Sequence, residues 1–355
     1  MDDAKHNVLF RRPGETTQTM HIFTAKDSTP LAHKRPAATL GVFDGVHRGH
    51  QTILASLTAT AREFGAPSLA ITFAQHPRQT LGRSAPPAIT TLERRLELMA
   101  EAGLDAVWVL DFTPEIAALP GREFAEEYFH RRLHASAVIL GEAARFGKGR
   151  DGAADSLADW SADWEMTVKA TPAFLIDGVK VSSTGVRLAV LSGALDQAAS
   201  SLGRPFSVIG TVVHGQGLAK PYGFPTLNLD PHHELRPPAG VYITKAYVEG
   251  NEYASITNVG RPPTDAEIDA GLGDLMIETH LLDYSGDLYG TVAEIAFYEK
   301  TRDAMRFANP ADLIAQVHRD MAQVRQRFAN ETITDQASTP ASQHTIIPQS
   351  APPIN

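Results

Sequence analysis

The chain has 355 residues, too many for one ordinary domain and enough for two domains with additional segments. Hydrophobic residues make up 43% and charged residues 21%, values near the globular average that exclude whole-chain disorder and a fibrous repeat. With 32 Lys and Arg against 41 Asp and Glu, the net charge of -9 argues against a protein whose main task is binding a nucleic-acid backbone. The chain has no cysteine, which excludes disulfides, a cysteine nucleophile and thiolate zinc sites.

Neither a secretory signal nor a membrane span is predicted. The N-terminal residues carry scattered charges and lack the apolar run of a signal peptide. No stretch approaches the roughly 18 consecutive apolar residues that a spanning helix needs. We therefore expect a cytoplasmic protein without nucleic-acid or membrane partners, and leave open whether it forms a homo-oligomer.

Residues 1–20 are predicted to be a flexible arm, and residues 21–203 alternate between strands and helices. The apolar runs predict strands at Ala37–Phe43, Pro67–Phe73, Ala106–Phe112 and Ser136–Gly141. The intervening patterns predict three helices. The first ends near Phe64, the second begins near Thr91 with a Thr90/Glu93 capping box, and the third spans Arg122–Leu133. This order is typical of an α/β, Rossmann-like domain with a parallel sheet, helices on both faces and ligands at the carboxyl ends of the strands.

From residue 204 to 329 strands follow one another, which predicts an antiparallel barrel or sandwich. The β-rich runs are Phe206–Val213, Gly240–Val248, Glu252–Val259, Leu275–Leu282 and Gly290–Tyr298. A closing helix is predicted after Asn309 as N-cap and Pro310, with an apolar stripe that we interpret as core packing. Residues 330–355 have no Lys or Arg and are rich in Pro, Ser and Thr, so we predict a disordered tail.

The turn after the first strand of the α/β domain is a candidate nucleotide site. It reads Gly41-Val42-Phe43-Asp44-Gly45-Val46-His47-Arg48-Gly49-His50. His47 and His50 are three residues apart at a helix start, so both imidazoles can face the loop. Glycines allow close approach of a phosphate, and the free N–H groups of the helix would bind it. The alternative is a histidine pair on a solvent-facing turn.

A second helix start, 182–187, has hydroxyls at Ser182, Ser183 and Thr184 and a guanidinium at Arg187. Hydroxyls and a guanidinium at a helix N-terminus also suit an anion. Taken alone, the same residues are equally consistent with an ordinary N-cap followed by a surface arginine.

A glycine-spaced loop that opens the β-rich half is the third candidate site. The loop has three glycines and a cation that could bind polyphosphate, namely Gly215, Gly217, Gly223 and Lys220. They are followed by two hard oxygen ligands that suit Mg²⁺, Thr226 and Asn228. A structural Gly-rich turn is the alternative. Downstream, Glu278 and His280 are two apart on a strand and face the same side, and a carboxylate on a buried strand is costly without a task or a partner.

Residues 37–328 contain sequence motifs that resemble those of the bacterial bifunctional riboflavin kinase/FMN adenylyltransferase (FAD synthetase) family. The motifs of the first half also resemble the nucleotidyltransferase superfamily. The motifs are His47-Arg48-Gly49-His50, Thr72-Phe73, His76-Pro77-Arg78, Arg145-Phe146-Gly147, Ser182-Ser183-Thr184-Gly185-Val186-Arg187, Phe224-Pro225-Thr226-Leu227-Asn228, Pro238–Tyr242, Asn258–Thr264 and Glu278–Gly290. The resemblance implies ATP as co-substrate, Mg²⁺ as cofactor, and riboflavin, FMN and FAD as substrates or products. It also implies that His47 and His50, with Gly41, Phe43, Asp44, Gly49 and the 182–187 residues, bind the nucleotide during adenylyl transfer.

For the kinase half, the resemblance implies that Glu278 is the general base for the riboflavin 5′-hydroxyl and that Thr226 and Asn228 hold the metal. It assigns no flavin-binding residues here.

Several positions depart from the family pattern. Ala74 and Gln75 replace an Asp-containing string, Ala143 and Ala144 replace a polar residue and an aromatic ring, Leu227 replaces Ala, Lys220 stands where Arg is more common, and Pro262 replaces Arg or Asn.

Three hypotheses follow. The first is an enzyme that phosphorylates riboflavin to FMN and adenylylates FMN to FAD with release of pyrophosphate. The second retains only the kinase, because losing one polar contact costs roughly 1–3 kcal/mol and Ala74 and Ala143 each lack one. The third is a non-catalytic flavin-binding regulator, which Thr226, Asn228 and Glu278 disfavour because a binder needs neither metal ligands nor a base.

Overall fold

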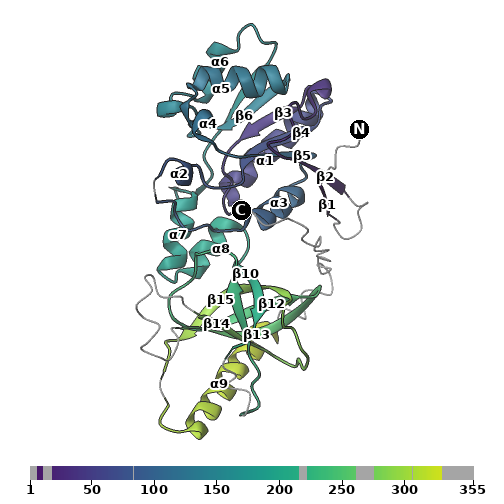
Figure 1. Cartoon of the computed structure of the whole chain (residues 1–355). Coiled ribbons are helices and arrows are strands. Elements are labelled where there is room, and N and C mark those ends of the chain that lie inside the picture. The colour runs from purple at the N-terminus through teal and green to yellow at the C-terminus, as the bar shows by residue number, and fades with distance from the viewer. Residues whose placement is uncertain are drawn as a thin grey trace. The chain divides into compact units, whose positions relative to one another are not determined.

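A computed structural model of the chain describes residues 6–10, 18–82, 84–215, 222–260, 276–305 and 307–329. These residues divide into two compact units (Figure 1). The first holds most of the chain up to Arg204 and the second holds the residues from Pro205 onward. Residues 1–5, 11–17 and 330–355 lie outside the described part, and with them the predicted tail and most of the predicted arm.

The first unit is built on a seven-stranded sheet in the order β1-β2-β5-β4-β3-β6-β7. Six strands from β2 to β7 run parallel, and β1 pairs antiparallel with β2 at the edge. The strands are β1 (His6–Phe10), β2 (Gln18–Phe23), β3 (Ala37–Leu40), β4 (Ser68–Phe73), β5 (Ala106–Leu110), β6 (Ala137–Gly141) and β7 (Thr167–Thr171). The predicted parallel sheet is confirmed.

Helices cover both faces of this sheet because its central strands are buried on both sides. Ala70, on one face of β4, packs with Leu54 of α1 (Arg48–Glu63) and Met99 of α3 (Leu92–Glu101). The residues next to Ala70 along β4 point to the other face of the sheet. They pack with Phe124 of α5 (Gly121–Ala125), with the π-helical segment η2 (Glu126–Arg132) and with α6 (Ala154–Trp160). The remaining elements are η1 (Ala32–Lys34), α2 (Pro77–Thr80), α4 (Pro114–Ala118), η3 (Lys148–Arg150), β8 (Leu175–Ile176), β9 (Val179–Lys180), α7 (Ser183–Leu191) and α8 (Leu195–Leu202).

Four details of this unit differ from the sequence prediction. The N-cap of α3 is Thr91, not Thr90 of the predicted capping box. The segment 1–20, expected to be an arm, contains β1 and the first residues of β2. The single helix expected over Arg122–Leu133 is α5 followed by η2. Strand β7 was not expected, because it is an edge strand in which four of the five residues are partly buried or exposed, and so it lacks an apolar run.

The second unit is a closed antiparallel barrel in the strand order β10-β11-β14-β13-β12-β15, which decides between the two predicted alternatives. The strands are β10 (Phe206–Val213), β11 (Leu227–Pro231), β12 (Gly240–Val248), β13 (Asn251–Gly260), β14 (Met276–Leu281) and β15 (Val292–Arg302). The helix α9 (Pro310–Ala329) follows, and Asn309 Oδ1 accepts a hydrogen bond from Asp312 N at 3.0 Å, which confirms the predicted cap.

Side chains of the barrel strands alternate between its interior and its outer face. Inside, a fully buried row of hydroxyls crosses three strands, with Thr244 Oγ1 2.8 Å from Thr257 Oγ1, which is 2.9 Å from Thr279 Oγ1. Outside, Ile243 and its neighbours on β12 and β13 pack against Val324 and Phe328 of α9. The apolar stripe of α9 is therefore a core contact with one outer face of the barrel. None of the helices in the described ranges is long and apolar enough to cross a membrane.

Candidate active sites

The Gly41–His50 turn connects β3 to α1 at the carboxyl edge of the parallel sheet. His47 is the N-cap of α1, and its Nδ1 accepts a hydrogen bond from His50 N at 3.3 Å. The turn needs a left-handed backbone at Gly45, where φ is +81° and a Cβ would lie 3.0 Å from the Ile89 side chain. The turn therefore places the N-terminus of a 16-residue helix at the edge where ligands of such sheets bind.

His47 and His50 form a stacked pair in this turn, with His47 buried and His50 partly buried. Their ring centroids are 3.6 Å apart and the rings are nearly parallel, at 16°. Burial lowers the pKa of His47 to about 4. Burial, followed by the charges of His47 and Arg95, lowers the pKa of His50 well below its ordinary value. Both rings are thus neutral at pH 7, and the buried His50 Nδ1 has no hydrogen-bond partner in the described residues.

The Asp44 carboxylate is fully engaged by the protein. Its Oδ1 accepts hydrogen bonds from Ile89 N at 3.0 Å and Thr90 N at 3.2 Å, and its Oδ2 accepts one from Arg187 Nη2 at 2.5 Å. Asp44 is only 4% exposed and Arg187 9%. In the structure, Asp44 positions Arg187 and the loop before α3. Direct contact of Asp44 with the nucleotide stays a prediction.

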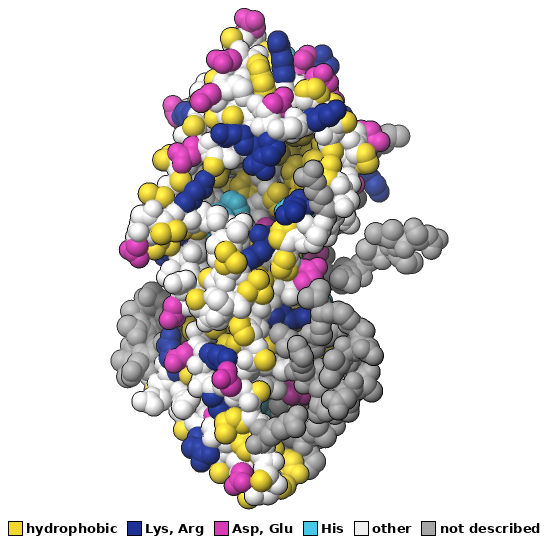
Figure 2. All heavy atoms as spheres, turned by 90° about the vertical axis from the view of Figure 1, so that its left-hand side faces the viewer, with side chains coloured by type: hydrophobic (Ala, Val, Ile, Leu, Met, Phe, Trp, Pro, Cys, Tyr) yellow, Lys and Arg dark blue, Asp and Glu magenta, His cyan; other side chains and the backbone are white. Residues whose placement is uncertain are grey.

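The 182–187 segment lies against this turn although it is more than 130 residues away in the sequence. Ser183 Oγ donates to Asp44 O at 3.1 Å, and Arg187 joins the Asp44 carboxylate. Ser182 Oγ accepts from Gly185 N at 3.1 Å, as an N-cap does, and Thr184 is exposed. The structure therefore brings together the two motifs that the sequence analysis paired. Figure 2 shows Lys and Arg side chains gathered around a hollow of this unit that contains hydrophobic side chains and a histidine.

The candidate base of the second unit lies in a row of polar side chains across three strands. Glu278 on β14 is opposite Asn228 on β11 and opposite Asn258 on β13. Asn258 Nδ2 donates to Glu278 Oε2 at 3.4 Å. Directly opposite residues share one face of a sheet, so this row lies on the outer face of the barrel. Asn258 was not among the predicted site residues, although its string had been singled out.

The start of the glycine-spaced loop passes close to the Asn228 side chain. A Cβ at Gly215 would collide with the Asn228 amide, so only glycine fits there. The Asn228 Oδ1 is buried and has no hydrogen-bond partner among the described residues. Gly223 has a left-handed φ of +88° one turn before Thr226. Gly217 and Lys220 lie outside the described residues, as does Pro262.

His280 anchors the segment that carries Thr226. Its Nδ1 is 2.8 Å from Pro225 O, and its ring meets Phe224 edge-on with centroids 5.8 Å apart. Phe224 in turn contacts His318 of α9 edge-on at 5.3 Å. The sequence placed His280 beside Glu278 without assigning it a role, and the structure makes it a support for the loop that precedes β11.

Comparison with known proteins matches each half of the chain separately. A sequence profile described as FAD synthetase matches residues 29–185, and one described as riboflavin kinase matches residues 202–328. A bifunctional riboflavin kinase/FMN adenylyltransferase from Pseudomonas fluorescens is 36% identical over 82% of this chain and 93% of its own length. The protein of that name from Escherichia coli K12 is 35% identical over 82% of this chain and 92% of its own length. The one from Listeria monocytogenes is 33% identical over 89% of this chain and 98% of its own length.

The chain belongs to the bifunctional riboflavin kinase/FMN adenylyltransferase family. The resemblance predicted from the motifs is confirmed. Among solved structures, the crystal structure of a macrolide-efflux protein from Streptococcus pneumoniae is similar over 86% of this chain and 98% of its own, with a TM-score of 0.76 and 25% identity.

Four of the departures from the family pattern flank the first site. Ala74 directly follows β4, where its N–H donates to Leu110 O at 3.0 Å, and Gln75 is exposed. Ala143 and Ala144 follow β6, with Ala143 exposed and Ala144 packed on the core. All four lie at the carboxyl edge near the His47–His50 turn. The match of the FAD synthetase profile and the bifunctional relatives favour the two-activity hypothesis over the kinase alone.

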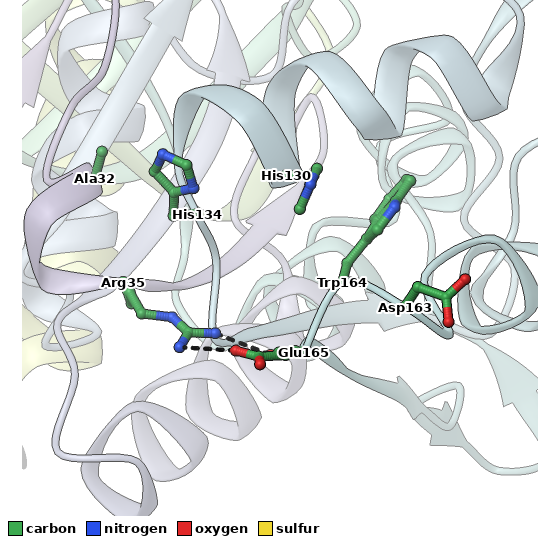
Figure 3. Close-up of a pocket in the computed structure, with 7 residues that line it drawn as sticks. All are labelled: Ala32, Arg35, His130, His134, Asp163, Trp164 and Glu165. Carbon is green, nitrogen blue, oxygen red and sulfur yellow. Dashed lines mark hydrogen bonds and ion pairs between the residues drawn. The ribbon is translucent and has the colours of Figure 1, made fainter.

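A pocket that the sequence did not predict lies before β3, β6 and β7, at the opposite edge of the sheet (Figure 3). It has a volume of about 360 Å³ and is lined by Ala32, Arg35, His130, His134, Asp163, Trp164 and Glu165. His130 stacks on Trp164 at 4.9 Å, and Arg35 donates to Glu165 O at 3.0 Å. No cluster of three or more acidic or histidine side chains suited to a metal occurs in the described ranges, here or elsewhere.

Proposed function

We propose that this protein phosphorylates riboflavin to FMN in the second unit and adenylylates FMN to FAD in the first, with ATP as co-substrate of both steps. The observation that carries this proposal is the presence of one assembled polar site in each unit. In the first unit the His47–His50 turn and the 182–187 segment meet. In the second, Glu278 lies between Asn228 and Asn258.

In the kinase reaction Glu278 acts as the general base. It takes the proton of the riboflavin 5′-hydroxyl as that oxygen bonds to the γ-phosphorus of ATP, and the bond from the γ-phosphorus to the β,γ-bridging oxygen breaks to release ADP. The hydrogen bond from Asn258 Nδ2 holds one carboxylate oxygen and leaves the other for the proton. A positioned base contributes roughly 10²–10⁴-fold to the rate. Gly215, Gly217, Lys220 and Gly223 would bind the ATP phosphates.

The residues around Asn228 fit a magnesium ion. Oδ1 of Asn228 is a buried carbonyl oxygen without a partner in the described residues, and Thr226 adds a hydroxyl next to the same strand. Oxygen ligands of this kind suit Mg²⁺, which commonly takes its other ligands from water and substrate phosphates. When bound, Mg²⁺ would neutralise part of the ATP phosphate charge.

In the adenylyltransferase reaction an oxygen of the FMN phosphate bonds to the α-phosphorus of ATP. The bond to the α,β-bridging oxygen breaks, and pyrophosphate leaves with the electron pair. The neutral His47 and His50 rings, the α1 N-terminus and the hydroxyls of Ser182 and Thr184 would donate hydrogen bonds to the phosphates, and the Asp44 carboxylate holds Arg187 in place. This chemistry is positioning and charge stabilisation, without a covalent intermediate.

One incubation tests both steps. Purified protein with riboflavin, ATP and Mg²⁺ should yield FMN and then FAD, which chromatography resolves by flavin. FMN without FAD would contradict the adenylyltransferase assignment, and no product at all would contradict both assignments.

A cytoplasmic location without nucleic-acid partners stays a prediction from composition, and a homo-oligomer stays an open alternative.

A further inference from the structure

Arg95, on α3, is a buried arginine whose charge is not paired by a carboxylate in the described residues. It is only 6% exposed. Its Nη1 donates to Phe73 O at 3.0 Å, and its buried Nε has no hydrogen-bond partner in the described part of the chain. A buried charge without a counter-ion costs several kcal/mol, so such a group is expected to have a task.

Two other arginines of this unit show the contrast. Arg187 is similarly buried, and Asp44 neutralises it at 2.5 Å. Arg94, the residue next to Arg95 on α3, pairs with Glu97 at 3.0 Å and with Glu101 at 3.1 Å. Of these three, only Arg95 has no carboxylate in ion-pair contact among the described residues, and the charges of Asp44 and Glu93 act on it from farther away.

Arg95 lies at the same edge of the sheet as the His47–His50 turn. Phe73, which accepts its hydrogen bond, is the last residue of β4, and β4 pairs with β3, which leads into that turn. Thr91, the N-cap of α3, follows directly on the loop that holds the Asp44 carboxylate. Arg95 is close enough for its charge to act on His50 and on His76. The unpaired charge and the unpaired His50 Nδ1 thus belong to one region.

We propose that Arg95 is a further phosphate-binding residue of the adenylyltransferase site, and that its guanidinium donates hydrogen bonds to the ATP phosphate oxygens held beside His50. This inference rests on the proposed adenylyl transfer. A guanidinium remains charged at every pH of interest and donates from several N–H groups, so it supplies the positive charge that the neutral His47 and His50 rings lack. Its burial excludes water and strengthens the interaction with an oxyanion.

The test compares Arg95→Met with Arg94→Met in the full chain. Both substitutions remove one guanidinium from α3, but only the first removes the unpaired one. We expect Arg95→Met to lower kcat/KM for FAD formation from FMN and ATP by about 10- to 100-fold, because a charge-assisted hydrogen bond is lost. Arg94→Met should stay within about threefold of the wild type. Phosphorylation of riboflavin, measured on the same preparations, should change in neither variant.

A second measurement covers the case that Arg95→Met fails to fold. In the wild-type protein, the Nε–H resonance of Arg95, assigned through Arg95→Lys, should shift on titration with pyrophosphate, whereas that of Arg94 should not. An unshifted Arg95 resonance at saturating pyrophosphate, or an Arg95→Met variant as active as Arg94→Met, would overturn the proposal. A wild-type protein that makes no FAD would instead overturn the adenylyltransferase assignment itself.

Discussion

At the scale of single residues, His47 makes the first unit sensitive to acid. Its folded-state pKa of about 4 lies below the ordinary value of 6.5, so the unfolded chain binds a proton before the folded one does. Stability should be intact above about pH 6.5, fall progressively as the pH drops from there toward 4, and lose no more through this group below about pH 4. The loss from His47 alone is on the order of 3 kcal/mol, and His50 adds to it.

His47→Asn tests this pH dependence, because asparagine keeps the N-cap without titrating. All three tryptophans of the chain, Trp108, Trp160 and Trp164, lie in the first unit, so urea unfolding followed by tryptophan fluorescence reports on it alone. Between pH 7 and pH 4.5 the variant should lose less free energy of unfolding than the wild type. An equal loss in both would contradict the assigned burial of His47.

Asp44→Asn should destabilise the same unit by about 3–5 kcal/mol, because it leaves Arg187 as a buried unpaired charge. The control is Glu63→Gln, which breaks the exposed ion pair with Lys169 and should cost less than about 1 kcal/mol. Both are measured by urea unfolding at pH 7. If the two substitutions cost the same, Asp44 does not hold the turn and the 182–187 segment together.

At the scale of elements, one buried carboxylate adds to the apolar contact that attaches α9 to the barrel. Asp320 is 1% exposed and accepts hydrogen bonds from Arg302 Nη2 at 2.7 Å and from Gln316 Nε2 at 2.7 Å. Asp320→Asn should loosen α9 from β15 by several kcal/mol, since it uncouples a buried pair. Hydrogen exchange of α9 peptides should accelerate in this variant and remain unchanged in Asp283→Asn, whose pair with Arg325 is exposed. Equal exchange in both variants would contradict this account.

The elements also show which signals the sequence carries. Buried parallel strands such as β4 are continuous apolar runs, and α9 has both a cap and a stripe, so both could be predicted. Edge strand β7 and the five-residue β11 offer no such run and were missed. The family resemblance supplied the role predicted for Glu278, and spacing along the chain made His47, His50 and Glu278 candidate site residues. It could not reveal that Asp44 pairs with Arg187, or Asn258 with Glu278, because those contacts depend on the folded topology.

Arg95 shows an intermediate case. It occupies a buried position on α3 beside Leu96 and Met99, and a charged residue within an apolar stripe is a signal that the sequence does contain. The sequence cannot distinguish a buried arginine that is paired from one that is not. That distinction, which separates Arg95 from Arg187, requires the carboxylates around each side chain to be known.

At the scale of the whole molecule, the proposed function requires two independent sites that share FMN as product and substrate. Two variants separate them. Glu278→Gln should lose FMN formation by at least about 100-fold and still convert added FMN to FAD. His50→Gln should accumulate FMN and lose FAD formation by a similar factor.

Mixing the two purified variants is the most direct measurement of this central claim. Given riboflavin, ATP and Mg²⁺, neither variant alone should make FAD at an appreciable rate, whereas the mixture should, because FMN released by the His50→Gln protein is a substrate for the Glu278→Gln protein. Chromatography of the flavins over time follows the result. Restored FAD formation is the predicted outcome, and a mixture that makes no FAD, or a single substitution that abolishes both steps, would contradict the account.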